Sequence, residues 1–283
     1  AEKLLDEYRI ALSSANSINW GRLLPQVVYY ISSYAELVAA GKIEAGCPID
    51  VCVPTGNFGN ILAAWYAKQI GVPIERLLCA SNDNRVLTDF INTGTYDISD
   101  REFILTSSPS MDILVSSNLE RLLFFASGAD ATRSRMQELA ETGRFAVDPA
   151  LRAALAKDFA AYYLDEDETR AAIRSLYGEY GYLCDPHTAV AAGALRKYRA
   201  ATGDDRVTVV ASTASPYKFA PAVCEALGMG TINDAYACID ALAEKTGLPV
   251  PPQLGELRSK PDRFTKVIDR ESIADAVRAF LSE

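Results

Sequence analysis

The sequence predicts an α/β fold in which helices flank both faces of a parallel sheet. Three short segments rich in β-prone residues are typical of buried strands, at residues 49–54, 77–80 and 207–211. Segments with apolar residues at helical spacing alternate with these strands, which favours parallel pairing. The chain has 283 residues, 49% of them hydrophobic, so it can bury a large core in one large or two modest domains.

The first predicted helix covers residues 22–40, where apolar side chains recur at helical spacing and Gly41 follows as a C-terminal cap. Pro25 predicts that the regular helix starts late or bends there, because proline lacks the amide hydrogen that a helix interior needs. A strand, a Gly-bearing turn and a second helix follow at residues 49–54, 55–60 and 61–70.

The stretch at residues 123–181 is rich in Ala, Arg, Glu and Leu with little strand signal, and we expect an all-helical insertion. Asp148-Pro149 and Asp185-Pro186 each fit an N-cap followed by proline at the first helical position. Further helices are expected at residues 84–91, 218–227 and 270–281, with an extended, proline-rich link at 247–252. The predicted organisation is a large sheet domain from residues 1–122 and 182–228, the insertion at 123–181, and a carboxy-terminal extension at 229–283.

Composition and charge exclude several classes of function. The net charge is −9 and the chain has no dense Lys/Arg run, which argues against a nucleic-acid surface. The longest apolar runs, such as residues 61–66, fall far short of the roughly 20 residues that span a bilayer. The chain also opens without a charged-then-apolar leader. We therefore expect a cytoplasmic protein with no nucleic-acid or membrane partner.

The cysteines and the single histidine, His187, argue against a metal site. Zinc requires clustered nitrogen or sulfur ligands, and the cysteines are dispersed without CxxC pairing. Some lie inside apolar patterns, as Cys52 does between Val51 and Val53, so we interpret them as reduced core residues. The six are Cys47, Cys52, Cys79, Cys184, Cys224 and Cys238.

The loop from Gly56 to Asn60 is the most informative local feature. Its glycines allow backbone N–H groups to converge on an anion, and the following helix adds its positive end, so the loop suits a phosphate. It lacks the Lys-Ser/Thr ending of an ATP-binding P-loop and the GxGxxG of a dinucleotide site. On spacing alone, an ordinary tight turn between strand and helix fits equally well.

Two further polar groups are candidates for binding an anionic ligand. Asn16, Ser17 and Arg22 place an amide, a hydroxyl and a guanidinium near the start of a helix, where a phosphate can accept charge-assisted hydrogen bonds. The alternative is a capped helix with a surface arginine. Thr213 directly follows an apolar strand, the position at which parallel sheets place ligand-contacting groups. Taken alone, that threonine is merely a strand end.

Five segments of the chain together resemble one known family. In their order and approximate spacing they are similar to the motifs of the threonine synthases, which are fold-type-II pyridoxal-phosphate (PLP) enzymes with a tryptophan synthase β-like fold. Arg22-Leu23-Leu24 and Gln26 follow the first motif as they do in the family. The segments are SANSIN at residues 14–19, PTGNFGN at 54–60, SPSMDI at 108–113, DPHTAVA at 185–191 and TASPYKF at 213–219.

The resemblance implies that the chain is the carboxy-terminal part of a lyase of threonine biosynthesis. The family converts O-phospho-L-homoserine and water to L-threonine and phosphate, with PLP as cofactor. By resemblance, the large domain holds the cofactor, and Thr213 places its hydroxyl against the pyridine nitrogen. The cofactor phosphate is assigned to Gly56, Asn57, Phe58, Gly59 and Asn60. The substrate phosphate is assigned to Asn16, Ser17 and Arg22, with Asn60 shared.

Three motif residues keep two interpretations. His187 opens a helix, and either a structural or a functional role fits it. Ser110 to Asp112 fit an active-site wall as well as a capped helix start. Lys218 begins a helix, and we assign it no catalytic role.

The departure from the family concerns the Schiff-base lysine. In the family it lies in an upstream Phe-Lys-Asp motif after a His-Gly-Pro segment, and no lysine of this chain has that context. The chain also begins only shortly before the first motif. We therefore expect a truncated sheet, no catalytic lysine in the chain and no activity of the chain alone. The alternatives are another fold-type-II lyase, such as a serine/threonine dehydratase or a cysteate synthase, and a stand-alone anion-binding module.

Overall fold

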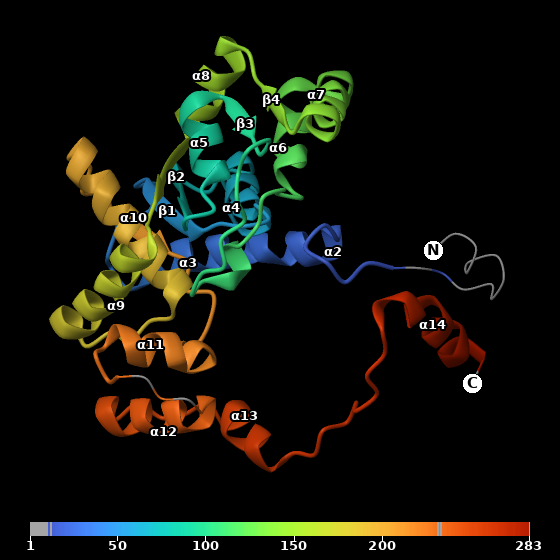
Figure 1. Cartoon of the computed structure of the whole chain (residues 1–283). Helices are drawn as coiled ribbons and strands as arrows, with labels where there is room; N and C mark the ends of the chain where they lie inside the picture. The colour runs from blue at the N-terminus through green and yellow to red at the C-terminus, as the bar shows by residue number, and fades with distance from the viewer. Residues whose placement is uncertain (1–10, 12, 231, 233, 283) are drawn as a thin grey trace.

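A four-stranded parallel sheet lies at the centre of the molecule (Figure 1). The computed structural model describes residues 11, 13–230, 232 and 234–282. The strand order is β5–β2–β1–β6, and every neighbouring pair is parallel. The parallel sheet and its three predicted strands are therefore confirmed. The strands are β1 (Ile49–Pro54), β2 (Ile74–Ser81), β5 (Phe159–Tyr163) and β6 (Thr208–Val210).

The two central strands are buried on both faces because their alternate side chains enter two separate cores. Val51 of β1 and Leu77 of β2 belong to one core, whereas Cys52 and Leu78 belong to the other. Strand β1 is buried along its whole length. This double burial is the physical reason that both strands are almost continuously apolar in sequence.

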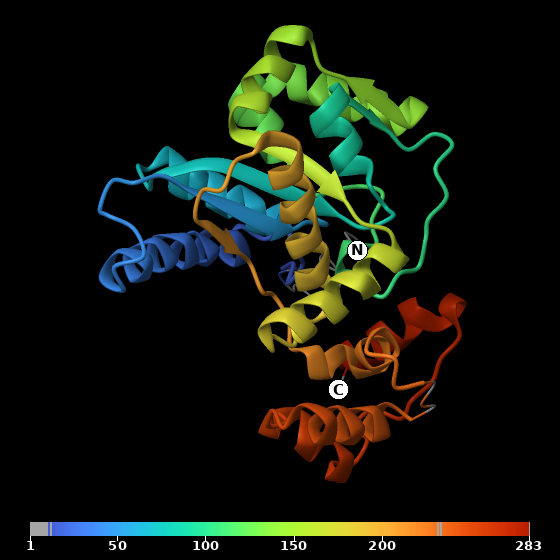
Figure 2. The ribbon, with the colours of Figure 1, turned by 90° about the vertical axis from the view of Figure 1, so that its left-hand side faces the viewer.

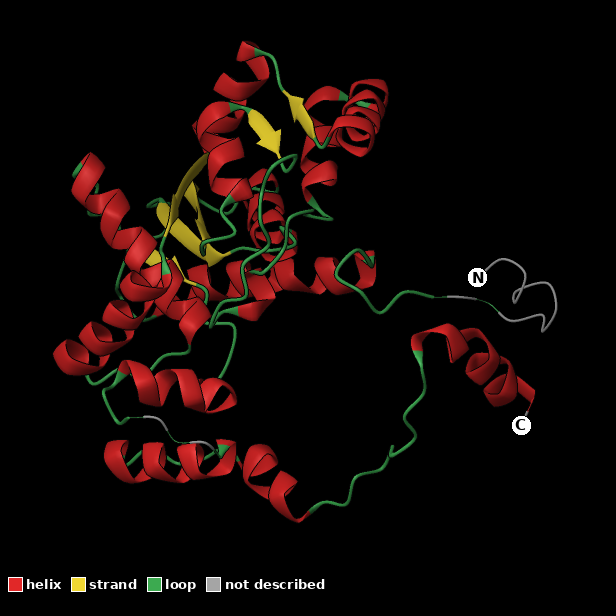
Figure 3. Ribbon diagram, in the orientation of Figure 1, coloured by secondary structure: helices red, strands yellow, loops and turns green. Residues whose placement is uncertain are grey.

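Helices cover both faces of the sheet (Figures 2 and 3). One core contains side chains from α3 (Val27–Ala39), α4 (Gly59–Gln69), α5 (Val86–Thr93), α6 (Leu119–Ser127) and α8 (Pro149–Asp158). The other face is covered by α10 (Pro186–Thr202), which contacts β1, β2 and β5. Beyond α10 follow α9 (Glu166–Tyr180), α11 (Ala220–Ala226) and α12 (Ala235–Thr246), stacked in that order (Figure 2).

The first helical segment breaks at its proline, as predicted. A short helix, α2 (Trp20–Leu23), passes through a 3-10 turn, η1 (Leu24–Gln26), into α3. Pro25 lies in the first turn of η1, where the missing amide hydrogen costs no helical bond. The break leaves a bent segment that passes beside the loop between β1 and α4.

The predicted all-helical insertion is wrong in one respect, because residues 123–181 contain two strands. Strand β5 pairs with β2 at the edge of the main sheet. The other, β4 (Arg144–Ala146), pairs antiparallel with β3 (Thr95–Asp97). Pairing with an existing strand outweighs the weak local preference of these short, alanine-bearing segments. The domain boundaries proposed from the sequence stay a prediction.

Strand β6 also differs from its prediction as a buried strand. Its three residues are only half-buried, because β6 is an edge strand whose one neighbour in the sheet is β1. An edge strand is paired with another strand on one side only, so its other side is less protected from solvent.

The remaining elements are short or peripheral. Residues 247–251 form the expected link before α13, and the last helix, α14, lies apart from the sheet at the end of an extended segment (Figure 1). These elements are α7 (Ala129–Thr142), α13 (Pro252–Gly255), α14 (Ile273–Ser282), η2 (Pro109–Met111), η3 (Pro216–Phe219), η4 (Glu256–Ser259) and η5 (Arg270–Ser272).

Candidate functional site

The loop between β1 and α4 contains an unusual backbone conformation. Phe58 has a φ of 62°, which makes it the one non-glycine residue with positive φ in the described part of the chain. This left-handed conformation costs ~1–2 kcal/mol for a residue with a Cβ. Burial of an aromatic ring contributes about 1.5–3 kcal/mol, which offsets that cost. The ring is 1% exposed and packs against Phe159 at 5.8 Å between centroids, so the core holds the strained turn in place.

Position 56 must be glycine because another backbone segment lies too close to leave room for a side chain. A Cβ at this position would lie 2.4 Å from the carbonyl oxygen of Ser110, a distance that only glycine avoids. The hydroxyl of Ser116 also donates to the carbonyl of Gly56 at 3.0 Å. The segment at residues 110–118 therefore forms a wall against the loop.

Asn118 ties the same wall to two predicted segments. Its side-chain amide donates to the carbonyl of Asn57 at 2.9 Å and to the carbonyl of Ser17 at 3.1 Å. Ser117 bridges the same pair, since its Oγ lies 3.3 Å from Asn57 Oδ1 and 3.4 Å from Ser17 Oγ. The structure thus brings Ser17 to the loop, whereas the exposed Asn16 accepts hydrogen bonds from the Ser17 amide and hydroxyl. Residues 116–118 were not predicted from the sequence, although a polar run before a helix is a recognisable start signal.

A cavity of about 730 Å³ joins three predicted residues from distant segments. Arg22 comes from α2, Asn60 from the first turn of α4, and Thr213 from the segment after β6. Gln26 and Tyr30 line the same cavity. The cavity extends from β6 to the segment that follows its carboxyl end, and the carboxyl ends of strands are where parallel sheets bind their ligands.

Asn60 is held in one orientation by two neighbours. Its Oδ1 accepts a hydrogen bond from the Tyr30 hydroxyl, and its Nδ2 donates to Gln26 Oε1 at 3.0 Å. Burial raises the pKa of Tyr30, so this hydroxyl stays protonated and remains a donor. One amide hydrogen of Asn60 is left for a ligand in the cavity.

Arg22 and Thr213 are both exposed where they line the cavity. The Arg22 guanidinium donates to the carbonyl of Ala15 at 2.6 Å, which anchors one of its five N–H groups. The remaining donors suit an anionic ligand.

His187 is buried and makes two specific polar contacts. The ring is 2% exposed, its Nδ1 lies 2.8 Å from Asp185 Oδ1, and its Nε2 accepts from the Ser110 amide at 3.2 Å. An amide can only donate, so Nε2 carries no hydrogen and the neutral ring donates from Nδ1 to the carboxylate. Lys218 is exposed and lies near the Phe219 ring, away from the lining of the cavity.

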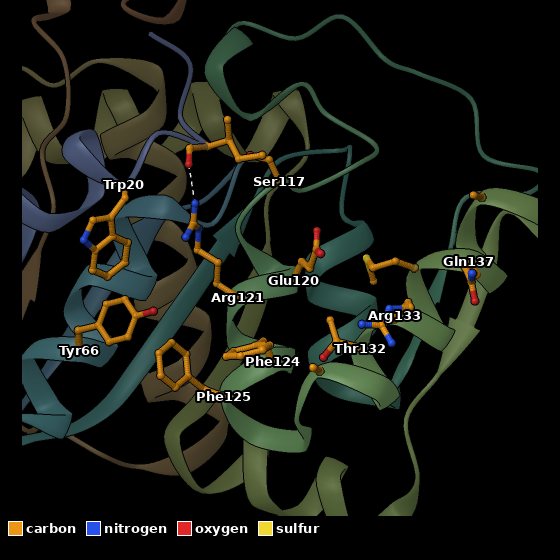
Figure 4. Close-up of a pocket in the computed structure, with 14 residues that line it drawn as sticks. Trp20, Tyr66, Ser117, Glu120, Arg121, Phe124, Phe125, Thr132, Arg133 and Gln137 are labelled. Carbon is orange, nitrogen blue, oxygen red and sulfur yellow. Dashed lines mark hydrogen bonds between the residues drawn. The ribbon is translucent and has the colours of Figure 1, made fainter. Parts of the chain in front are cut away.

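A second cavity of about 810 Å³ has Ser117 of the wall in its lining (Figure 4). Trp20, Tyr66, Phe124 and Phe125 line one part of it with aromatic rings (Figure 4). Arg121 spans the gap to the first motif by donating to the carbonyl of Ile18 at 2.6 Å (Figure 4). This second cavity was not predicted from the sequence.

Among the described residues, no group of three or more His, Cys, Asp or Glu side chains is placed to hold a metal ion. No described helix combines the length and apolarity needed to cross a membrane.

Comparisons with known proteins agree on one family. The family model "Threonine synthase, C-terminal" matches residues 188–280. The chain is 51% identical to human "Threonine synthase-like 1" over 232 residues, covering 81% of this chain and 31% of that protein. It is 35% identical to the threonine synthase of Saccharomyces cerevisiae over 288 residues, covering 96% of this chain and 54% of that protein.

The same relationship holds for a solved structure. A PLP-bound threonine synthase from Brucella melitensis superposes with a TM-score of 0.82 at 35% identity. The match covers 100% of this chain and 56% of that one.

The fold and the loop cluster define a parallel α/β domain of the fold-type-II class. Within that class, the chain belongs to the threonine synthase family. It spans between about a third and about half of the length of the relatives described above.

Proposed function

We propose that this chain forms part of a PLP-dependent threonine synthase that converts O-phospho-L-homoserine and water to L-threonine and phosphate. The observation that carries the proposal is the cavity that joins Arg22, Asn60 and Thr213 beside the Gly-bearing loop. We also propose a cytoplasmic location, supported by six free cysteines of which five are buried.

The residues of the loop fit the phosphate of PLP. Gly56 permits the close approach of the wall, and the left-handed turn at Phe58 leads directly into the amino-terminus of α4. Backbone N–H groups there are oriented by the helix and by the strained turn, which suits a phosphate dianion. Thr213, which lines the cavity together with Asn60, would offer its hydroxyl to the ring nitrogen of PLP without adding a charge.

In this proposal, the chain's own residues bind and orient two phosphates. Bound PLP supplies the electron sink that stabilises negative charge on the substrate carbons. Gly56 to Asn60 hold the cofactor phosphate, while Arg22 with the Ser17 segment holds the phosphate that leaves the substrate. A guanidinium there neutralises the charge that develops on the leaving group. No lysine is among the described residues that line the cavity, and we propose that the chain alone is inactive.

Phosphate binding by the chain itself tests the loop. We expect phosphate to raise the melting temperature, by a stabilisation that reaches about 2.7 kcal/mol at 100 times Kd. Gly59→Val, at the first position of α4, should abolish this response. Gly178→Val in α9 is the matched control, because an added Cβ meets no atom within 4 Å there. An equal phosphate response in Gly59→Val would refute the placement of the anion.

The reaction itself is tested on the complete gene product supplied with PLP. We expect release of phosphate and formation of threonine from O-phospho-L-homoserine. Release of ammonia from serine or threonine, without phosphate release, would instead support the dehydratase alternative. Arg22 in the cavity favours the synthase, because a second anionic group needs a cation.

A further inference from the structure

We propose that His187 and Asp185 are positioning residues that set the spacing between the phosphate loop and Thr213. The inference rests on the proposed function of that loop. Neither residue lines the Arg22–Thr213 cavity, which is the cavity that also contains Asn60, or the second cavity beside Trp20 and Phe125. A direct contact with a ligand in either cavity is therefore not their role. Both are almost completely buried, Asp185 with 0% and His187 with 2% of its surface exposed.

The first arm of this arrangement runs from Asp185 to the phosphate loop. Asp185 Oδ1 accepts from His187 Nδ1, which fixes the ring and leaves Nε2 as an acceptor for the Ser110 amide. The carbonyl of the same Ser110 is the group against which Gly56 must lack a side chain. Ser110 is therefore clamped between a buried imidazole and the loop, and its position sets the position of Gly56.

A second network holds the same wall from its far side. Asp112 Oδ1 accepts from the side chains of Asn82 at 2.8 Å and Thr106 at 2.7 Å. The turn at Pro109–Met111 thus lies between two polar anchors, the buried His187 and the half-buried Asp112. Of these two anchors, His187 is the one that contacts Ser110, the residue whose carbonyl faces Gly56.

The second arm runs from Asp185 to the other end of the cavity. Its Oδ2 accepts from the Thr188 hydroxyl, and Thr188 Oγ1 lies 3.2 Å from Ser212 Oγ. Ser212 directly precedes Thr213, and both line the cavity. One buried carboxylate at the start of α10 therefore connects, through His187 and Thr188, to the wall beside the phosphate loop and to the Ser212–Thr213 segment.

Two amide substitutions separate the contacts of His187. In His187→Gln the terminal amide reaches the place of Nε2 and keeps an acceptor for Ser110. In His187→Asn the shorter amide reaches the place of Nδ1, keeps the bond to Asp185 and loses the one to Ser110. Both remove the imidazole that packs on Phe219 at 4.8 Å between centroids, so the loss of this aromatic contact is common to the two variants.

The readout is phosphate affinity of the whole chain, measured by calorimetry with inorganic phosphate, together with hydrogen exchange of the Ser110 amide. We expect His187→Asn to weaken phosphate binding about fivefold, the equivalent of one neutral hydrogen bond, and to speed Ser110 exchange by a similar factor. His187→Gln should stay within about twofold of wild type in both measurements. Equal effects of the two variants, or wild-type values in His187→Asn, would overturn the proposal. If the wild-type chain binds no phosphate, the proposed function fails, and Ser110 exchange alone then decides the role of His187.

Thr188→Val tests the second arm with a side chain of the same shape. We expect it to weaken PLP binding about threefold to fivefold while leaving the affinity for inorganic phosphate unchanged, because the loss is confined to the Ser212–Thr213 end. Equal losses for PLP and phosphate would show a general loosening and would contradict the two-arm arrangement.

Discussion

Arg22 shows how one side chain combines a structural contact with a proposed functional one. One of its N–H groups anchors the Ala15 carbonyl, and its remaining donors border the cavity that contains Asn60 and Thr213. The neighbouring Asn60 is fully oriented by Tyr30 and Gln26. The side chains of Arg22 and Asn60 are therefore positioned by contacts within the protein, before any ligand binds.

Replacing Arg22 with alanine in the complete gene product should impair turnover and spare cofactor binding. Its proposed partner is the leaving phosphate of the substrate, and a hydrogen bond to a charged group is worth ~1.5–3 kcal/mol. We expect kcat/KM for O-phospho-L-homoserine to fall roughly tenfold to a hundredfold or more, with PLP affinity nearly unchanged. Arg22→Lys should recover only part of the loss, because an ammonium lacks the planar fork. Loss of PLP with normal kinetics of the saturated enzyme would show that the two phosphate sites are assigned wrongly.

Among the helices, α10 begins with three buried polar side chains, those of Asp185, His187 and Thr188. Asp185 caps the helix by accepting from the His187 amide at 2.9 Å. Burial alone would raise the pKa of the Asp185 carboxyl, but hydrogen bonds from His187 and Thr188 outweigh burial and lower it. A carboxyl whose pKa is lower in the folded state stabilises the fold above its unfolded pKa of about 3.9. That contribution is lost as the pH falls through the lowered, folded value.

In Asp185→Asn, the free energy of unfolding should therefore depend less on pH in the acid range than it does in the wild-type chain. Asparagine retains one acceptor oxygen for the N-cap, so the change removes the charge together with one of the two acceptor oxygens. At pH 7 we expect the free energy of unfolding to fall by about 1.5–3 kcal/mol, the worth of a charge-assisted hydrogen bond. Below about pH 4 the difference between variant and wild type should shrink. Urea unfolding across this pH range provides the measurement, and parallel profiles would contradict the role of the charge.

Strand β5 is one of the strands that the sequence pattern did not predict. Its residues, Phe-Ala-Ala-Tyr-Tyr, directly follow α8 and contain two alanines, so the local signal favours continued helix. The register with β2, from Leu77 opposite Phe159 to Ser81 opposite Tyr163, supplies the backbone partners that make it a strand. Those partners lie about 80 residues away in sequence, beyond the reach of any local pattern.

For the whole molecule, the placement of lysines leads to a spectroscopic prediction. No lysine of the chain lies in the context that the family uses for its cofactor, and the described lining of the Arg22–Thr213 cavity contains none. Added PLP should therefore give the chain no Schiff-base absorption band that is stoichiometric and belongs to one site. Titration with PLP, followed by the variants Lys218→Ala and Lys245→Ala, checks this. A stoichiometric band that disappears in Lys218→Ala alone would assign a catalytic lysine to this chain.

The sequence by itself determined the parallel sheet and the broken first helix, whereas the assignment of residues 56–60 to an anion stays a prediction. Strand burial and proline chemistry are local properties that a sequence states directly. The same sequence named Asn16, Ser17, Arg22 and Thr213 only through motifs, since their spacing alone fits ordinary caps and strand ends.

Tertiary structure alone decided which of these residues meet. Arg22, Asn60 and Thr213 line one cavity because β1 and β6 are neighbours in the sheet and the segment of α2 and α3 passes beside both. The wall at residues 110–118, the buried clamp of His187 and the strand β5 depend on contacts between distant segments. Such contacts form only when the chain folds, because their energy comes from partners that no short stretch of sequence contains.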